Sequence, residues 1–119
     1  MSQYYDSLPS SPSNERNISF EIDGKNITLI TDNGVFSKGR IDEGSFIFLK
    51  EILPLSLGNN ILDLGCGYGV IGLTISLFKE EASVTLADIN TRALTLCRKN
   101  AQNLGVILYP VFSGAGLKV

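Results

Sequence analysis

Residues 61–70 read ILDLGCGYGV, and ADIN follows at residues 87–90. The apolar start of the first stretch predicts a short buried strand, and its three alternating glycines let the backbone turn closely around a ligand. A helix is expected to begin at the final valine. Asp88 then lies at the end of the next predicted strand. The two stretches together predict a ligand-binding turn at the carboxyl end of a sheet.

The residues around these stretches extend the pattern to a βαβαβ unit. Apolar residues at spacings of three and four predict an amphipathic helix after the glycine turn, and 83–87 reads as a strand. Asn90 suits the N-cap of a second helix that ends at Gly105, and 106–112 reads as a third strand. Crossovers of this length require parallel strands, so residues 59–112 are expected to form a doubly wound, Rossmann-like α/β unit.

The preceding part of the chain predicts a tail, a hairpin and a helix. Residues 1–17 are rich in Ser, Asn and Pro without a hydrophobic period, which predicts a flexible tail. Alternating apolar residues on both sides of Asp23 and Gly24 predict a β-hairpin. Ser45 suits the N-cap of a helix that Pro54 ends.

The length of the chain allows a single small core. A chain of 119 residues is sufficient for one domain. We expect a flexible tail over 1–17, followed by one partial α/β domain over 18–119. Within that domain, 18–56 would hold the hairpin and helix, and 59–112 the βαβαβ unit.

Composition excludes several classes of function. The chain is 44% apolar and 18% charged, as in ordinary globular proteins, with no apolar run near the ~18 residues of a membrane span. The polar N-terminus lacks a signal-peptide pattern, so a cytoplasmic location is expected. Two cysteines and no histidine argue against a zinc cluster or a disulfide framework. A net charge of −2 gives no electrostatic argument for nucleic-acid binding.

Charge also indicates which ligand suits the glycine turn. A dinucleotide site favours Gly-x-Gly-x-x-Gly against a pyrophosphate, but Val70 occupies the third glycine position. Asp63, at the end of the strand, would repel phosphates and favour an ammonium group, which S-adenosylmethionine carries. The carboxylate of that cofactor can accept bonds from the backbone of residues 67–70, and Asp88 can accept bonds from the ribose hydroxyls. The pattern therefore favours S-adenosylmethionine.

Other interpretations remain open. An NAD-dependent oxidoreductase would also use a glycine turn and a following acid, and a non-catalytic adenosyl-binding or interaction module would keep the same residues. Cys66 is more simply a packing residue than a reactive thiol, because no activating base is visible. Asn100 is most simply an exposed helix residue.

The chain resembles the class I S-adenosylmethionine-dependent methyltransferases, in particular the methyltransferase small domain family that includes bacterial small-subunit rRNA guanine-N2 methyltransferases. The likeness runs from about residue 20 to 108 and rests on GVFS at 34–37, D-x-GS at 42–45, LDLGCGYGVIG at 62–72, DIN-x-RAL at 88–94 and NA-x-x-N at 100–103. The resemblance implies methyl transfer from S-adenosylmethionine to ribosomal RNA, with the loop 36–45 closing beside the transferable methyl. The candidate cofactor-binding residues are Asp63, Gly65, Cys66, Gly67, Gly69, Asp88 and Ile89.

The chain departs from this family in its catalytic motif. The family places Asn-Pro-Pro and an aromatic residue after its fourth strand, where they orient the target amine. None of the four prolines here follows an asparagine, so no catalytic residue is assigned. The sequence stops soon after the third predicted strand, and we therefore expect a truncated domain, either a natural fragment or a frameshift product. The first strand of the unit would then keep an unpaired edge that favours self-association.

Overall fold

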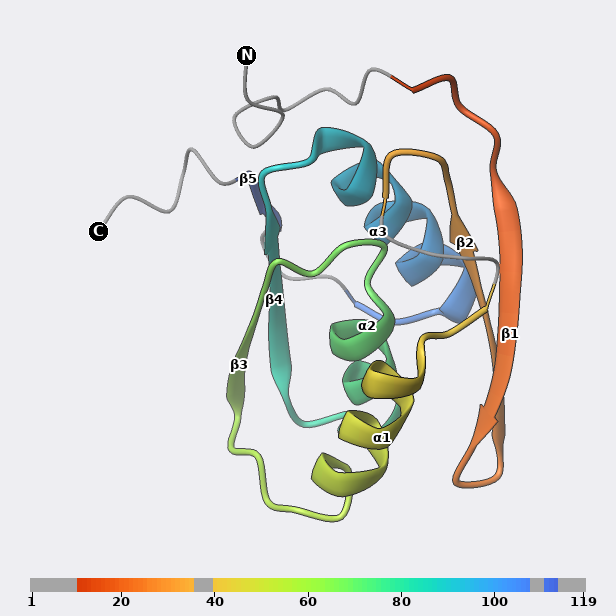
Figure 1. The fold of residues 1–119 in the computed structure, drawn as a ribbon. Helices are drawn as coiled ribbons and strands as arrows, with labels where there is room; N and C mark the ends of the chain where they lie inside the picture. Colours follow the sequence, from red (N-terminus) through yellow and green to blue (C-terminus); the bar gives the residue numbers. More distant parts are fainter. Residues whose placement is uncertain (1–10, 36–39, 108–110, 114–119) are drawn as a thin grey trace.

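The computed structural model describes residues 11–35, 40–107 and 111–113. Its elements are β1 (Arg16–Ile22), β2 (Lys25–Thr31), α1 (Glu43–Ile52), β3 (Asn60–Leu64), α2 (Val70–Phe78), β4 (Ser83–Asp88), α3 (Thr91–Leu104) and β5 (Val111–Ser113). The hairpin β1-β2 and the sheet β3-β4-β5 enclose a middle layer of three helices (Figure 1). The apolar faces of both sheets and of the helices meet in one core. The α/β fold predicted from the sequence is confirmed.

The N-terminal hairpin has the predicted form. β1 and β2 pair antiparallel, and alternate apolar side chains of both strands are buried against the helices. Asp23 and Gly24 connect the strands with φ angles of 47° and 83°. Two consecutive positive φ angles are the requirement of the tight turn that matches the twist of a hairpin.

The segment before β1 differs from the predicted flexible tail of residues 1–17. β1 already begins at Arg16. Ahead of it, the Ser13 hydroxyl donates to Asp32 Oδ2 at 2.6 Å, and Arg92 Nη2 donates to the Ser11 carbonyl at 2.7 Å. Hydrophobic periodicity cannot reveal such attachment, because polar groups make it. Residues 1–10 of the predicted tail lie outside the described part.

Helix α1 begins three residues earlier than predicted. Asp42, not Ser45, is its N-cap, and the carboxylate accepts bonds from both the backbone nitrogen and the hydroxyl of Ser45 at 2.8 and 2.7 Å. Both residue types suit an N-cap, but the acid can accept both of these bonds at once. The helix ends at Ile52, shortly before Pro54, as expected.

The second sheet is parallel, with the strand order β3-β4-β5. Helix α2 begins at Val70, and α3 lies between its predicted caps, Asn90 and Gly105. Each strand is added to the sheet on the same side of the one before it, and both crossover helices lie on the same face of the sheet (Figure 1). The described part therefore corresponds to one half of a doubly wound sheet, with helices on a single face. Helices cover both faces only where the strand order reverses.

The third strand of the unit is shorter than predicted at its start. The sequence predicts a strand over 106–112, whereas β5 spans Val111–Ser113. Val106 instead completes the end of α3, where its backbone nitrogen donates to the Ala101 carbonyl at 3.1 Å. This bond follows from the left-handed conformation of Gly105, with a φ of 72°, which turns the chain back on the helix.

Close packing holds α2 against the sheet. A Cβ atom added to Gly72 would lie 2.4 Å from Leu86 Cδ2 and 3.0 Å from Asp63 Oδ2. The helix therefore packs directly on β3 and β4. On the opposite face of β3, Leu62 and Leu64 are 55% and 68% exposed. In the described part of the chain, no helix has the length and apolar character needed to cross a membrane.

Candidate cofactor site

The turn between β3 and α2 depends on glycine. Gly65, Gly67 and Gly69 have φ angles of 73°, 57° and 98°, which other residues rarely adopt. At Gly69 an added Cβ would also lie 2.6 Å from Leu73 Cδ1. At Gly65 and Gly67 it would meet no atom within 4 Å, so this side of the turn borders open space in which a ligand can lie.

The neighbouring strand fixes the position of the turn. The backbone nitrogens of Gly65 and Cys66 donate to the Ala87 carbonyl at 2.7 and 3.0 Å, and that of Gly67 donates to Asp88 Oδ2 at 2.8 Å. The turn consequently lies across the carboxyl ends of β3 and β4. Ligands of parallel α/β sheets bind at this end of the strands.

Asp88 is oriented by two backbone amides. Its Oδ2 accepts from the nitrogen of Gly67, and its Oδ1 accepts from the nitrogen of Asn90 at 2.9 Å. The residue is half-buried. A carboxylate oxygen can accept more than one hydrogen bond, so both oxygens retain capacity for a hydroxyl. The parallel pairing thus brings the predicted acid beside the predicted turn.

Asp63 has a structural role that the sequence did not indicate. Its Oδ2 accepts a hydrogen bond from the backbone nitrogen of Gly72 at 2.9 Å. Gly72 is the third residue of α2, and the N-cap, Gly69, has no side chain to satisfy that amide. Asp63 therefore caps the helix from the preceding strand.

The environment of Asp63 makes the site electronegative. The pKa of its carboxyl is raised, mainly by burial and further by the negative charge of Asp88. The hydrogen bond from Gly72 offsets part of this rise. The two acids come from adjacent strands and influence each other. A cation that binds between them would relieve this repulsion. In the described part of the chain, Oδ1 of Asp63 has no hydrogen-bond donor.

The other two candidate side chains differ in exposure. Ile89, next to Asp88, is 46% exposed and offers apolar surface beside the acid. The Cys66 side chain is buried, with its Sγ 3.6 Å from the Sγ of Cys97. The hydrogen bond with Cys66, together with burial, raises the pKa of Cys97, so this thiol stays protonated at neutral pH. The Cys66 side chain therefore has a packing role in the core. Only the backbone of this residue is near the open side of the turn.

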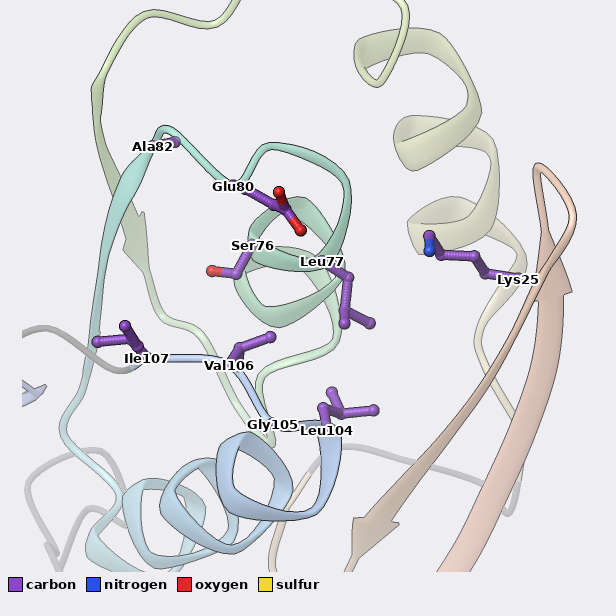
Figure 2. A pocket seen from close by; sticks show the side chains of 9 residues that line it. All are labelled: Lys25, Ser76, Leu77, Glu80, Ala82, Leu104, Gly105, Val106 and Ile107. Carbon is purple, nitrogen blue, oxygen red and sulfur yellow. The ribbon is translucent and has the colours of Figure 1, made fainter.

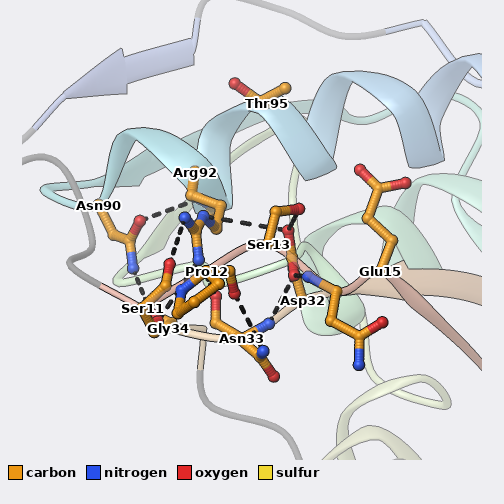
Figure 3. Close-up of polar contacts among 12 residues, drawn as sticks. Ser11, Pro12, Ser13, Glu15, Asp32, Asn33, Gly34, Asn90, Arg92 and Thr95 are labelled. Atoms are coloured by element: carbon orange, nitrogen blue, oxygen red, sulfur yellow. Dashed lines mark hydrogen bonds and ion pairs between the residues drawn. The ribbon is translucent and has the colours of Figure 1, made fainter.

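A polar network attaches the N-terminal segment and the residues after β2 to the start of α3, close to Asp88 in the sequence (Figure 3). Arg92 donates to the carbonyls of Asn33 and Ser11 at 2.6 and 2.7 Å. Asn90, whose Oδ1 caps α3, donates from Nδ2 to the Gly34 carbonyl at 2.7 Å. This network was not predicted from the sequence. The run of polar residues directly after the predicted hairpin, at positions 31–33, was the one sequence feature that could have indicated it.

Asp32 is the buried acceptor of that network. Its Oδ1 accepts from the backbone nitrogens of Asn14 and Asn33, and its Oδ2 from the Ser13 hydroxyl. Burial opposes the charge, but these bonds and nearby Arg92 outweigh burial and lower the pKa of Asp32. The network holds residues 32–34, shortly before the loop 36–45 that was predicted to close beside the transferable methyl. Residues 36–39 of that loop lie outside the described part.

Asn100 is not the exposed residue that the sequence suggested. It is completely buried, and its Nδ2 donates to the carbonyl of Tyr68 in the glycine turn at 2.9 Å. Helical periodicity alone does not distinguish a buried asparagine from an exposed one.

A separate cavity of about 420 Å³ lies between the C-terminal ends of α2 and α3 (Figure 2). Lys25 and Glu80 are its charged lining residues, and Leu77, Leu104 and Val106 supply apolar surface. It lies at the end of the strands opposite the glycine turn and shares no residue with it. The candidate cofactor site is therefore the turn and its two acids.

Comparison with known proteins finds a family that matches most of the chain. The profile of the family described as "Methyltransferase small domain" matches residues 26–115. The chain is 37% identical over 103 residues to the uncharacterized protein YbxB of Bacillus subtilis, a match that covers 87% of this chain and 51% of that protein. It is 45% identical over 91 residues to ribosomal RNA small subunit methyltransferase C of Hahella chejuensis, covering 76% of this chain and 26% of the relative.

A solved structure supports the fold. The 16S rRNA N2 guanosine methyltransferase of T. thermophilus, in complex with AdoMet and guanosine, superposes with a TM-score of 0.72 at 27% identity. The match covers 84% of this chain and 28% of that one. The chain thus spans about half the length of the B. subtilis relative and about a quarter of the other two. Because the family profile covers most of the sequence, from β2 through the glycine turn to β5, the chain belongs to the methyltransferase small domain family.

Proposed function

We propose that this chain is the S-adenosylmethionine-binding part of a methyltransferase that acts on the N2 amine of guanine in 16S ribosomal RNA. The observation that carries the proposal is the contact between Asp88 and Gly67, which places a carboxylate beside an open glycine turn. The names of the relatives supply the substrate class, since they include a small-subunit rRNA methyltransferase and a structure with AdoMet and guanosine.

The residues of the site fit each part of this cofactor. The amides of Tyr68 and Val70 donate to no group within the described residues and are available to a carboxylate. Asp63, and the field that it shares with Asp88, would attract the ammonium group. Asp88 would accept bonds from the ribose hydroxyls, and Ile89 would contact the adenine. When bound, the cofactor supplies an electrophilic methyl group on a sulfonium.

Methyl transfer needs a second set of residues. The nucleophile and the methyl must be held in line, and the family uses Asn-Pro-Pro for this purpose. That motif does not occur in the 119 residues. We therefore propose that these residues bind the cofactor, and that a segment or partner carrying the amine-orienting motif completes the enzyme. A cytoplasmic location accords with a ribosomal RNA substrate.

A calorimetric titration with S-adenosylhomocysteine tests the cofactor assignment. Wild type should bind it in preference to NADH, because Asp63 disfavours phosphate. Asp88→Ala should bind it more weakly by ~1.5–3 kcal/mol, through loss of charge-assisted bonds to the ribose. Glu81→Ala is the matched control, since it removes the same charge from an exposed position before β4.

Each outcome of this titration has a distinct meaning. Equal affinity of a folded Asp88→Ala variant and wild type would show that the site is wrongly placed. Preferential binding of NADH would favour the oxidoreductase interpretation. Binding of S-adenosylhomocysteine with no transfer to 16S RNA, even after addition of a partner that carries Asn-Pro-Pro, would favour the non-catalytic module.

A further inference from the structure

Asn100 is a buried side-chain amide that connects three parts of the molecule. Its Oδ1 accepts from the Ile30 nitrogen at 2.7 Å, and its Nδ2 donates to the carbonyls of Ile30 and Tyr68 at 3.0 and 2.9 Å. None of its surface is exposed. A primary amide has two donor hydrogens, and here each has a carbonyl partner. The amide group lies within hydrogen-bonding distance of β2 and of the glycine turn while its backbone belongs to α3.

The two contacts of Asn100 differ in kind. The Asn100 amide accepts a hydrogen bond from the backbone N–H of Ile30 and donates one to the Ile30 carbonyl, as the backbone of an adjacent strand would. Toward Tyr68 it bonds a carbonyl that lies one residue before the N-cap of α2, outside the hydrogen-bonding pattern of the helix. Within the described residues, no other donor reaches that buried carbonyl. A buried carbonyl without a donor is costly, so the turn depends on Asn100 for this conformation.

Tyr68 lies between Gly67 and Gly69, the second and third glycines of the turn. Gly67 donates to Asp88, and Gly69 donates to the Cys66 carbonyl at 3.0 Å. The peptide unit before Tyr68 carries the Tyr68 amide, which is proposed to face the cofactor carboxylate, and the unit after it carries the Gly69 amide, whose bond to Cys66 closes the turn. A rotation of the Tyr68 carbonyl would turn the next amide, that of Gly69, because both belong to one planar peptide unit.

We infer that Asn100 is a positioning residue that acts through the Tyr68 carbonyl to keep the glycine turn in its cofactor-binding conformation. This inference rests on the proposed function, because it assumes that the turn contacts a cofactor. Removal of the Asn100 amide should loosen the turn more than it loosens the rest of the fold, and should weaken cofactor binding in molecules that remain folded.

The test compares Asn100→Asp with Asn103→Asp. An ionised aspartate only accepts hydrogen bonds, so at position 100 it would face the carbonyls of Ile30 and Tyr68 without a donor. Asn103 lies one turn further along α3 and is exposed, so the same change there controls for the added charge. Affinity for S-adenosylhomocysteine is measured by calorimetry. Native-state hydrogen exchange is measured without ligand at the amides of Gly67 and Gly69 and, for reference, throughout β4.

We expect Asn100→Asp to bind S-adenosylhomocysteine about tenfold more weakly than wild type, as loss of one buried hydrogen bond predicts. Exchange at Gly67 and Gly69 should accelerate more than exchange in β4, whereas Asn103→Asp should match wild type in both measurements. Unchanged affinity, or exchange that accelerates equally everywhere, would overturn the inference and leave Asn100 with a role in stability alone.

Two further measurements keep the result decisive. If Asn100→Asp does not fold, Asn100→Ala removes the same bonds without burying a charge, and the same criteria apply. If wild type does not bind S-adenosylhomocysteine, the proposed function fails. In that case hydrogen exchange alone decides whether Asn100 positions the turn, because that measurement needs no ligand.

Discussion

At the scale of single residues, backbone conformation and local space decide which positions tolerate a side chain. Gly58 and Gly69 both have positive φ angles, 82° and 98°. An added Cβ meets no atom within 4 Å at Gly58, but lies 2.6 Å from Leu73 Cδ1 at Gly69. The two positions therefore share the conformational strain and differ in the steric clash.

Alanine substitution at these two glycines separates the two effects. Gly58→Ala should lower the free energy of unfolding by ~1–2 kcal/mol, the cost of a left-handed conformation. Gly69→Ala should cost a further ~1–3 kcal/mol, because the Leu73 side chain must move in a packed core. Urea unfolding of both variants measures the difference. Equal losses would mean that Leu73 adapts freely and that the turn requires glycine only for its φ angle.

At the scale of one element, the N-terminus of α1 depends on an ionised cap. The hydrogen bonds from Ser45 lower the pKa of Asp42, so the folded state favours the charged carboxylate. A lowered folded-state pKa contributes stability at neutral pH. That contribution is lost as the pH falls through the folded-state pKa.

Replacement of the cap should therefore change the acid sensitivity of the protein. Asp42→Ala should lower the free energy of unfolding at pH 7 by ~0.5–2 kcal/mol, the usual cost of losing an N-cap. Below the usual aspartate pKa of ~4, the difference between the variant and wild type should shrink. Denaturant unfolding at several pH values measures both. A difference that does not change with pH would show that the charge of Asp42 is not what stabilises the helix.

At the scale of the whole molecule, the parallel sheet has an unpaired border. Within the described residues β3 pairs only with β4, and the exposed Leu62 and Leu64 lie on its uncovered face. Exposed apolar edge strands pair readily with other chains. We propose that this edge mediates self-association of the 119-residue chain.

Charge placed at this edge should oppose such pairing. Leu64→Lys should shift the chain toward monomer in sedimentation equilibrium, because pairing would bring like charges together or bury them. Ile107→Lys introduces the same charge at another exposed position, in the cavity at the opposite end of the strands, and should leave the distribution unchanged. A wild-type chain that is monomeric at all concentrations would refute self-association through β3.

Local sequence determined the elements, the parallel unit and the glycine turn with its second acid, because these follow from hydrophobic period, turn chemistry and helix caps. Tertiary structure decided how distant polar groups are used. It caps α2 with Asp63, attaches Ser11 to Arg92 and buries Asn100 against Tyr68. From the sequence alone, a buried and hydrogen-bonded aspartate or asparagine looks the same as one exposed on the surface. Only the folded chain shows which backbone amide or carbonyl lies within hydrogen-bonding distance of its side chain.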